Sequence, residues 1–472
     1  MQKIYNQLTL SDVYKNCQDL FETEKPKFLK LLESIIDFAD FIPQSFYDAF
    51  YQHFGRNRSY SLESFISAFV LQKIFSIPTD TLLITFLNVS EELKNFCGFK
   101  KVPDNSKFTR FKQRFIGELT LMFDSLVDYT EPICTAIDKN LASSLIYDTS
   151  GLEPYVTENN PKFVNKLINS LKSVYKNDPS VDIYKLAYNF MPSHSASEPS
   201  VKQMYINGHF CYAHKFGILT NGLGIPRHLA FFDDEYTKLH PEISVEKKSD
   251  SPDEDKSLGD SRTLQPVLGD FFSKHPDFHY DTFLGDSAFD SADHFSFLKN
   301  TCNFKKALIP INPRNESLLP SVGYNEFGYP VCPGDPKLDM RYLGATREKG
   351  RSNRLKWGCP KFKKGVCHCS KPCSDAKFGR TSYTFESGNF RLFPGIPRDS
   401  VEWFSAYKTR TVIEQSINHI KYNMCVADRK SRCFATSKSD ILFACISQLF
   451  TVIVADRLKN LKLFRSLKCL IA

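Results

Sequence analysis

Four side chains near the C-terminus are of types that bind phosphates and metal ions. Tyr407, Arg410, Glu414 and Lys421 stand at offsets of 0, 3, 7 and 14 residues from the tyrosine. On one continuous α-helix, which turns ~100° per residue, they would fall within roughly 60° of arc. A carboxylate flanked by a phenol, a guanidinium and an ammonium suits a site that holds a metal ion against a nucleic-acid backbone. The alternative is a solvated stripe in which Arg410 and Glu414 form a surface i, i+4 ion pair.

Two aspartates upstream could complete such a site. The segment SSLIYDTSG predicts a short apolar strand that ends in Asp148, and FLGDSAFD predicts a second strand that ends in Asp286. Asp281 and Asp290 compete with Asp286. However, the Gly-Asp exit from the apolar run places Asp286 at the carboxyl end of its strand, where such sites form. Taken singly, each aspartate is better explained as a turn or cap residue at a strand end.

Together these residues resemble the bacterial insertion-sequence DDE transposases, in the group marked by a Tyr-x2-Arg-x3-Glu-x6-Lys signature. Tyr407, Arg410, Glu414 and Lys421 match that spacing without a gap, and the two aspartates precede them in the right order. The stretch YDTSGLEPYVTENNPKF is similar to the family's first-aspartate region. The resemblance extends over nearly the whole chain.

The resemblance implies an α/β fold: an RNase H-like mixed sheet flanked by helices, with an N-terminal helical domain and a β-rich insertion. Cleaving a phosphodiester needs an activated nucleophile, a stabilised leaving oxygen and neutralised charge on phosphorus, and two Mg²⁺ ions about 3.5–4 Å apart provide all three. Carboxylates are the hard oxygen donors that Mg²⁺ prefers. We expect Asp148, Asp286 and Glu414 to be catalytic and to hold two Mg²⁺ ions, for which Mn²⁺ can substitute, with Asp148 shared by both.

The activity that the resemblance implies is DNA transposition. The protein would bind the terminal inverted repeats of its element, cleave the ends and transfer the 3′-OH strands into target DNA. Arg410 and Lys421 would grip phosphates near the cleaved end, with Tyr407 hydrogen-bonded to one of them. Action on two ends implies a homodimer on DNA. The alternatives are an RNase H-like nuclease without strand transfer and a non-catalytic, domesticated DNA-binding protein.

Composition and periodicity divide the chain into four segments. The first is helical, the second alternates apolar strands with polar stretches, the third is rich in Gly, Pro, Cys and basic residues, and the last is helical. We expect a helical DNA-binding or dimerisation domain, the first part of the catalytic core, a β-rich insertion and the second part of the core at residues 1–130, 131–311, 312–398 and 399–472.

Helix-start signals mark the first segment. A helix is expected to begin after Ser61 as its N-cap, a second at Thr79 or Asp80, and a third near Asn105 or Ser106.

Basic side chains crowd the opening turns of the third helix: Lys107, Arg110, Lys112 and Arg114. Short helices joined by tight turns, one of them basic, are typical of DNA-binding domains. A plain helical bundle whose cations only face water explains the pattern equally well.

Five of the fourteen cysteines gather in the third segment, at Cys332, Cys359, Cys367, Cys369 and Cys373. Two Cys-Pro knuckles, with two of the other three thiols, could close a tetrahedral structural Zn²⁺ site. Ordinary reduced thiols are the alternative.

Basic residues surround the cysteine cluster in the sequence, with aromatic residues between them. This pattern favours contact with a DNA backbone over a solvated loop. The basic residues are Arg341, Arg347, Lys349, Arg351, Arg354, Lys356, Lys361, Lys363 and Lys364, and the aromatic residues are Tyr342, Trp357 and Phe362.

Bulk composition agrees with a globular protein that meets a polyanion. The 472 residues are 42% hydrophobic and carry a formal net charge of +8.

The longest apolar run, Ile441–Ala455, is shorter than the ~20 residues that span a bilayer, so we expect a buried core helix and no membrane partner. The N-terminus carries no secretory signal pattern, and we expect reduced cysteines in the bacterial cytoplasm, associated with the nucleoid. No P-loop or dinucleotide fingerprint stands out, so the sequence does not imply a nucleotide cofactor.

Overall fold

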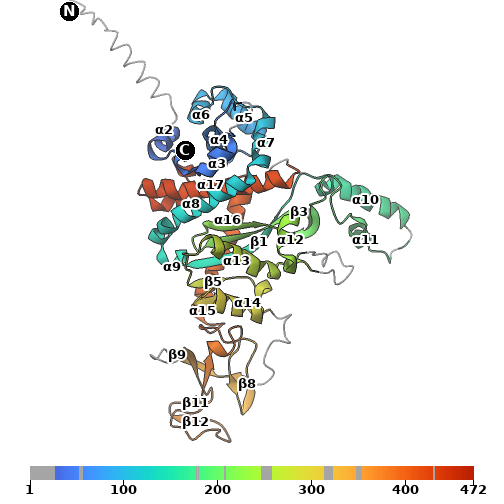
Figure 1. Ribbon diagram of the computed structural model, residues 1–472. Helices are drawn as coiled ribbons and strands as arrows, with labels where there is room; N and C mark the ends of the chain where they lie inside the picture. The colour runs from blue at the N-terminus through green and yellow to red at the C-terminus, as the bar shows by residue number, and fades with distance from the viewer. Residues whose placement is uncertain are drawn as a thin grey trace, which may run out of the picture. The chain divides into compact units, whose positions relative to one another are not determined.

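The chain forms two compact units in the computed structural model (Figure 1). One unit contains the described part of Met1–Ile133 together with Asn418–Ala472, and the other contains Cys134–Ile417. The structure describes residues 27–52, 57–176, 178, 180–206, 209–245, 258–312, 323–346, 353–428 and 431–471.

The compact units do not follow the four segments drawn from the sequence. The C-terminal residues from Asn418 onward group with the N-terminal helices, whereas the sequence analysis assigned 399–472 to the catalytic core. The cause is the long helix α17 (Phe434–Arg457), which contacts the helices α4 and α7 of the N-terminal region. The boundaries of the functional domains stay a prediction.

Helices make up the first unit, as the sequence predicts for its N-terminal part. Phenylalanine rings hold them together: the ring of Phe69 lies 4.5 Å from that of Phe443 in α17, and Phe65 stacks on Phe111 at 4.9 Å. The helices are α2 (Lys27–Ile35), α3 (Gln44–Phe50), α4 (Leu62–Ile74), α5 (Asp80–Val89), α6 (Glu91–Phe96), α7 (Asn105–Arg114), α8 (Ile116–Ile137), which runs across the division between the units, and α17, with short turns at Phe38–Phe41, His419–Asn423, Leu461–Arg465 and Lys468–Leu470.

The helix starts expected from the sequence are confirmed. The hydroxyl of Ser61 accepts a hydrogen bond from the amide of Ser64 and caps α4. Thr79 caps α5 in the same way, and the carboxylate of Asp104 caps α7. Each side chain satisfies a backbone donor that the helix leaves unpaired.

Lys112 of α7 departs from both interpretations offered for the basic helix. Its side chain is fully buried, and its ammonium lies 2.6 Å from a carboxylate oxygen of Asp80 and 2.9 Å from one of Asp440 in α17. It also lies 4.8 Å from the centre of the Phe69 ring. Lys112 therefore neither faces water nor offers its charge to DNA; it ties α5, α7 and α17 together.

Helix α17 is the one helix in the described part of the chain that is long and apolar enough to cross a membrane by length and composition. Its most apolar window has a mean hydropathy of 1.6, and 94% of that window is buried inside the protein. Such burial is typical of the core helix of a globular protein.

A mixed sheet organises the second unit, with strand order β2-β3-β1-β5-β6 and β4 paired to β3. β1 runs antiparallel to β3 but parallel to β5, and β5 runs parallel to β6. β3 and β4 pair antiparallel and form a hairpin. The strands are β1 (Ser144–Leu152), β2 (Lys202–Ile206), β3 (His209–Asn221), β4 (Pro226–Phe231), β5 (Thr282–Leu284) and β6 (Lys306–Leu308).

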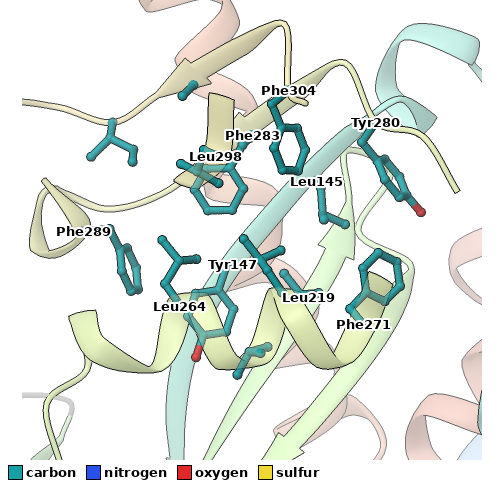
Figure 2. Packing of buried hydrophobic residues seen from close by; sticks show 14 of the residues in the cluster. Leu145, Tyr147, Leu219, Leu264, Phe271, Tyr280, Phe283, Phe289, Leu298 and Phe304 are labelled. Carbon is teal, nitrogen blue, oxygen red and sulfur yellow. The ribbon is translucent and has the colours of Figure 1, made fainter. Parts of the chain in front are cut away.

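Helix α13 (Leu264–Lys274) covers one face of this sheet. Figure 2 shows Leu145 and Tyr147 of β1 meeting Leu264 and Phe271 of that helix. Tyr147 is fully buried, and its hydroxyl lies 2.6 Å from that of Thr263. Since side chains alternate along a strand, residues 146 and 148 point to the opposite face.

Shorter helices and small sheets complete the second unit. The β-rich character expected of the insertion is confirmed in the described residues by sheets of strand order β7-β8, β13-β10-β9 and β11-β12. Their strands are β7 (Val331–Cys332), β8 (Asp335–Asp339), β9 (Arg341–Thr346), β10 (Arg354–Gly358), β11 (Phe362–Lys363), β12 (Val366–Cys367) and β13 (Thr381–Phe385). The remaining helices are α9 (Lys139–Ala142), α10 (Pro161–Val174), α11 (Ile183–Phe190), α12 (Asp234–Leu239), α14 (Ala292–Ser296), α15 (Val401–Tyr407) and α16 (Thr411–Asn418).

The Lys112 contacts predict a large loss of stability on substitution. Lys112→Met leaves the carboxylates of Asp80 and Asp440 without their shared ammonium in a buried place, and we expect it to cost the helical unit about 3–5 kcal/mol. Lys107→Met, on the exposed side of the same helix, should change stability by less than about 0.5 kcal/mol. Urea titrations followed by helical circular dichroism measure both. Equal, small effects of the two variants would show that the buried pairs do not hold the unit together.

Candidate active site of three carboxylates

The strand register brings the two aspartates level. β1 and β5 run parallel with Ile146 opposite Leu284, and the same register carried two residues further sets Asp148 opposite Asp286. Parallel neighbouring strands end at the same edge of a sheet, so acidic residues at their carboxyl ends meet there. Residues far apart in the chain thus share one place in the sheet.

Asp148 differs from its predicted position in one respect. The sequence places it at the end of its strand, but β1 continues to Leu152. The extension exists because the long strand β3 pairs with β1 out to His214 opposite Leu152. Asp148 nevertheless lies beyond the end of its other neighbour, β5, so its carboxylate is only half-buried.

Arg410 gathers the three predicted carboxylates. One terminal nitrogen of its guanidinium, Nη2, lies 3.3 Å from Asp286 and 3.5 Å from Asp148, and the other, Nη1, lies 2.8 Å from Glu414. The Arg410–Glu414 contact is the i, i+4 pair that the sequence offered as the alternative. The guanidinium is mostly buried, with 15% of the side chain exposed, and links its helix to an aspartate on β1 and to another just after β5, so the pair is more than a surface stripe.

The helix that carries the signature is not continuous. α15 ends at Tyr407, Lys408–Arg410 form a 3-10 turn, α16 follows, and His419–Asn423 form a π-helical turn. The single stripe within 60° of arc, which assumed an uninterrupted α-helix, is therefore wrong. The 3-10 turn is the segment from which Arg410 reaches both aspartates.

Lys421 belongs to the other compact unit. It lies in the π-helical turn and its side chain is buried, with 5% exposed. Its role as a phosphate ligand stays a prediction. Three isoleucines of the signature segment, Ile413, Ile417 and Ile420, are buried.

Tyr407 supports the second aspartate from the helix side. Its hydroxyl donates a hydrogen bond of 3.3 Å to the carbonyl oxygen of Gly285, the residue before Asp286. Burial raises the pKa of the Tyr407 hydroxyl to about 12, against the opposing charge of Arg410. The ring stacks on Trp403, with centroids 4.6 Å apart. Trp403 was not singled out from the sequence, although its i, i+4 spacing from Tyr407 was a usable signal.

The competing aspartates have other partners. Asp290 is fully buried and forms a two-point contact with Arg391, at 2.8 and 2.7 Å. Asp281 is exposed at the start of β5 and pairs with Lys305 at 2.7 Å. Of the three aspartates near this strand, the structure brings only Asp286 to the group around Arg410.

Crowded carboxylates perturb the protonation of this centre. Burial raises the pKa of Asp148 to about 6; the charge of Arg410 and a hydrogen bond from the amide of Thr149 oppose the rise, and Asp286 and Glu414 add to it. Burial disfavours the charged form of Arg410, but the surrounding carboxylates outweigh it and raise the pKa of the guanidinium. The centre therefore depends on a cation between its acids.

The donor set matches a hard divalent cation in type. As they stand, no three or more His, Cys, Asp or Glu side chains in the described ranges are arranged to hold one metal ion. In this centre the guanidinium of Arg410 contacts all three carboxylates. Carboxylate oxygens that already gather round one positive charge are the ligands that Mg²⁺ prefers. The three carboxylates are thus of the donor type that Mg²⁺ prefers, and in the structure the guanidinium of Arg410 occupies the place between them.

The cysteine cluster gives no such fit. Cys367 and Cys369 interact through their thiols at the end of the β11–β12 hairpin, which raises the pKa of Cys369. Cys332 and Cys359 are buried and Cys373 is exposed, and none of the five forms a disulfide bond. No three of these described thiols are arranged as ligands of one ion. The zinc site stays a prediction.

The basic surface expected around the cysteines is only partly visible. Arg347, Lys349 and Arg351 lie outside the described residues. Trp357 is a core residue, 1% exposed and packed with Met340 and Leu355, so it does not offer a ring to DNA.

Comparison with known families points to the same class of protein. Residues 16–114, about a fifth of the chain, match the family described as "Transposase domain (DUF772)". A search of curated protein sequences gives no match. The N-terminal region therefore carries a transposase domain, which indicates a function in DNA transposition and DNA as a partner.

The raised pKa predicts a stabilising substitution. Above pH 6 the folded protein carries the Asp148 charge at a cost, because an ordinary aspartate ionises at 3.8. Asp148→Asn removes that cost and should raise the stability of the second unit by ~1–3 kcal/mol at pH 7.5. The gain should fade between pH 6 and pH 4, where wild-type Asp148 becomes protonated in both states. Thermal melts in EDTA across this pH range measure it; a variant less stable than wild type at pH 7.5 but not at pH 4 would contradict it.

Proposed function

We propose that this protein is a DNA transposase of the DDE type. It binds the terminal inverted repeats of an insertion sequence, cleaves the ends and transfers the 3′-OH strands into target DNA. The observation that carries the proposal is the meeting of Asp148, Asp286 and Glu414 at Arg410. The transposase-domain match at 16–114 supports it independently, because that match lies in the other compact unit.

The strand order supports an RNase H-like core. Three antiparallel strands, β4, β3 and β1, are followed by β5 and β6, which run parallel to β1. This arrangement puts one acidic residue on β1, one after β5 and one on a helix that packs near the β3–β4 turn, where Gly224 meets Val412. In the family that the chain resembles, these three places hold the catalytic carboxylates.

Each side chain has a role that follows from its chemistry. Asp148, Asp286 and Glu414 would hold the Mg²⁺ ions, with Asp148 as the proposed shared ligand. When bound, the ions would activate the attacking oxygen, stabilise the leaving 3′-oxygen and neutralise charge on phosphorus. Tyr407 holds the Gly285 carbonyl and so orients Asp286.

Arg410 has two tasks in this proposal. Its guanidinium offsets the mutual repulsion of the carboxylates, and it is the group nearest to them that can bind a substrate phosphate by two parallel hydrogen bonds. Lys421 is the second proposed phosphate ligand. Cleavage and strand transfer use the same carboxylates, because both are in-line displacements at phosphorus. A homodimer assembled on two DNA ends in the bacterial cytoplasm is part of the same proposal.

A nicking assay on end DNA tests the proposal. Purified protein is incubated with labelled duplex that carries the element end, with Mg²⁺ or with EDTA. We expect Mg²⁺-dependent nicking at the element boundary, and a loss of at least ~10³-fold in Asp148→Asn, Asp286→Asn and Glu414→Gln, because each variant removes a ligand charge. Asp281→Asn, just before β5 and paired with Lys305 at the surface, should nick like wild type.

The other outcomes separate the alternatives. Nicking that ignores the DNA sequence, with no joined product when target DNA is added, favours a nuclease without strand transfer. Binding of end DNA without nicking by the wild type favours a non-catalytic DNA-binding protein. Full activity in any of the three carboxylate variants contradicts the assignment of that residue.

A further inference from the structure

A basic pocket of about 800 Å³ opens on the helical unit, inside the segment that matches the transposase domain. Four cationic side chains line it, and within the described residues no aspartate or glutamate does; the four are Arg58, Lys107, Arg110 and Arg114. Aromatic rings, among them Phe50 and Phe115, also line the pocket. We call this feature the α7 pocket.

Three of the four cations come from one side of α7. Lys107, Arg110 and Arg114 stand at i, i+3 and i+7, which puts them on a common helix face, and all three are exposed. Phe108 and Lys112 of the same helix are buried on its other side. On α7, Lys112 is therefore buried and paired with carboxylates, whereas Lys107, Arg110 and Arg114 form an exposed basic face.

The cations of the α7 pocket lack carboxylate partners in the described part of the chain. Arg110 donates to the side chain and the carbonyl of Ser106, at 2.7 and 3.2 Å. Arg58 donates to the carbonyl of Phe50 and lies 4.0 Å above the centre of its ring. The carboxylate of Asp104, close to Lys107 in sequence, caps the helix and accepts from the backbone amide of Lys107.

Glu63, another acid of this region, interacts with two phenols. Burial raises the pKa of Tyr47 and of Tyr51, and the carboxylate of Glu63 adds to both rises. Arg58, by contrast, has a lowered pKa, from burial and from the like charge of Arg114. An anionic ligand in the pocket would reduce the repulsion between the guanidiniums of Arg58 and Arg114.

We propose that the α7 pocket binds the sugar-phosphate backbone of duplex DNA, with Arg58, Arg110 and Arg114 as its phosphate contacts. This inference rests on the proposed function and names the surface through which the helical unit holds the DNA. Seven residues of α-helix span ~10 Å. Successive phosphates of one strand advance 3.4 Å along the duplex axis, so the basic face follows about three of them. Planar guanidiniums bind phosphate oxygens in pairs of hydrogen bonds.

Equilibrium binding of DNA at several salt concentrations tests the pocket. The probe is a fluorescent 30-base-pair duplex with the element end, beside an unrelated duplex of the same length. We expect the triple variant Arg58→Gln/Arg110→Gln/Arg114→Gln to bind both duplexes at least ~10-fold more weakly at 150 mM salt. The slope of log K against log salt should fall by ~2–3, at about 0.9 for each lost phosphate contact.

The matched control removes the same charge from the same region. Lys94→Gln/Lys100→Gln/Lys101→Gln changes three cations that do not line the pocket and should weaken binding by less than ~3-fold. Since Arg58 packs on Phe50, the double variant Arg110→Gln/Arg114→Gln is a second test, with an expected fall in slope of ~1.8. Its thermal midpoint should match that of wild type.

Each outcome bears on the α7 pocket. If DNA binding is weakened equally in the pocket and control variants, the effect is one of net charge and the proposal for the α7 pocket is overturned. Unchanged binding in both pocket variants overturns it too, and if wild-type protein still nicks end DNA, the proposed function stands. Weakening on the element end alone, with the unrelated duplex unaffected, would mean base recognition and contradict backbone contact. Absence of any DNA binding by wild type overturns the pocket and the proposed function together.

Discussion

One guanidinium permits three carboxylates to occupy the same place in this fold. Asp148, Asp286 and Glu414 come from positions spread over more than half of the chain, and their charges would repel one another without Arg410 between them. The arginine is itself stabilised by these acids, since they raise its pKa despite its burial. The rest of the second unit can be understood as a scaffold that delivers four side chains to one point.

Backbone geometry, more than the length of the side chains, brings these residues together. The parallel register of β1 and β5 sets the two aspartates level, and α13 fixes the sheet by packing on its far face (Figure 2). Tyr407 links the helix to the loop before Asp286. A similar ion-pair arrangement stabilises the helical unit, where Lys112 lies between Asp80 and Asp440, which are 360 residues apart in sequence. In both units a cation joins acids from distant segments.

Local features were predictable from the sequence and long-range ones were not. Caps such as Ser61 and the β3–β4 hairpin follow from residue types within a few positions, and the structure contains both. The extension of β1 past Asp148 depends on β3, and the burial of Lys112 depends on α17. The contacts of Arg410 depend on Asp148 and Asp286. None of these partners is near in sequence. The Gly-Asp exit from the apolar run nevertheless selected Asp286 over its neighbours, and in the structure Asp290 pairs with Arg391 instead.

The central claim is that these three carboxylates act together as one metal-binding centre. Electron paramagnetic resonance of added Mn²⁺, which reports bound against free ion, measures this most directly. The account predicts bound Mn²⁺ in the wild type and in Asp281→Asn, and the loss of the tight sites in Asp148→Asn, Asp286→Asn and Glu414→Gln alike. Undiminished Mn²⁺ binding in all three variants would contradict it.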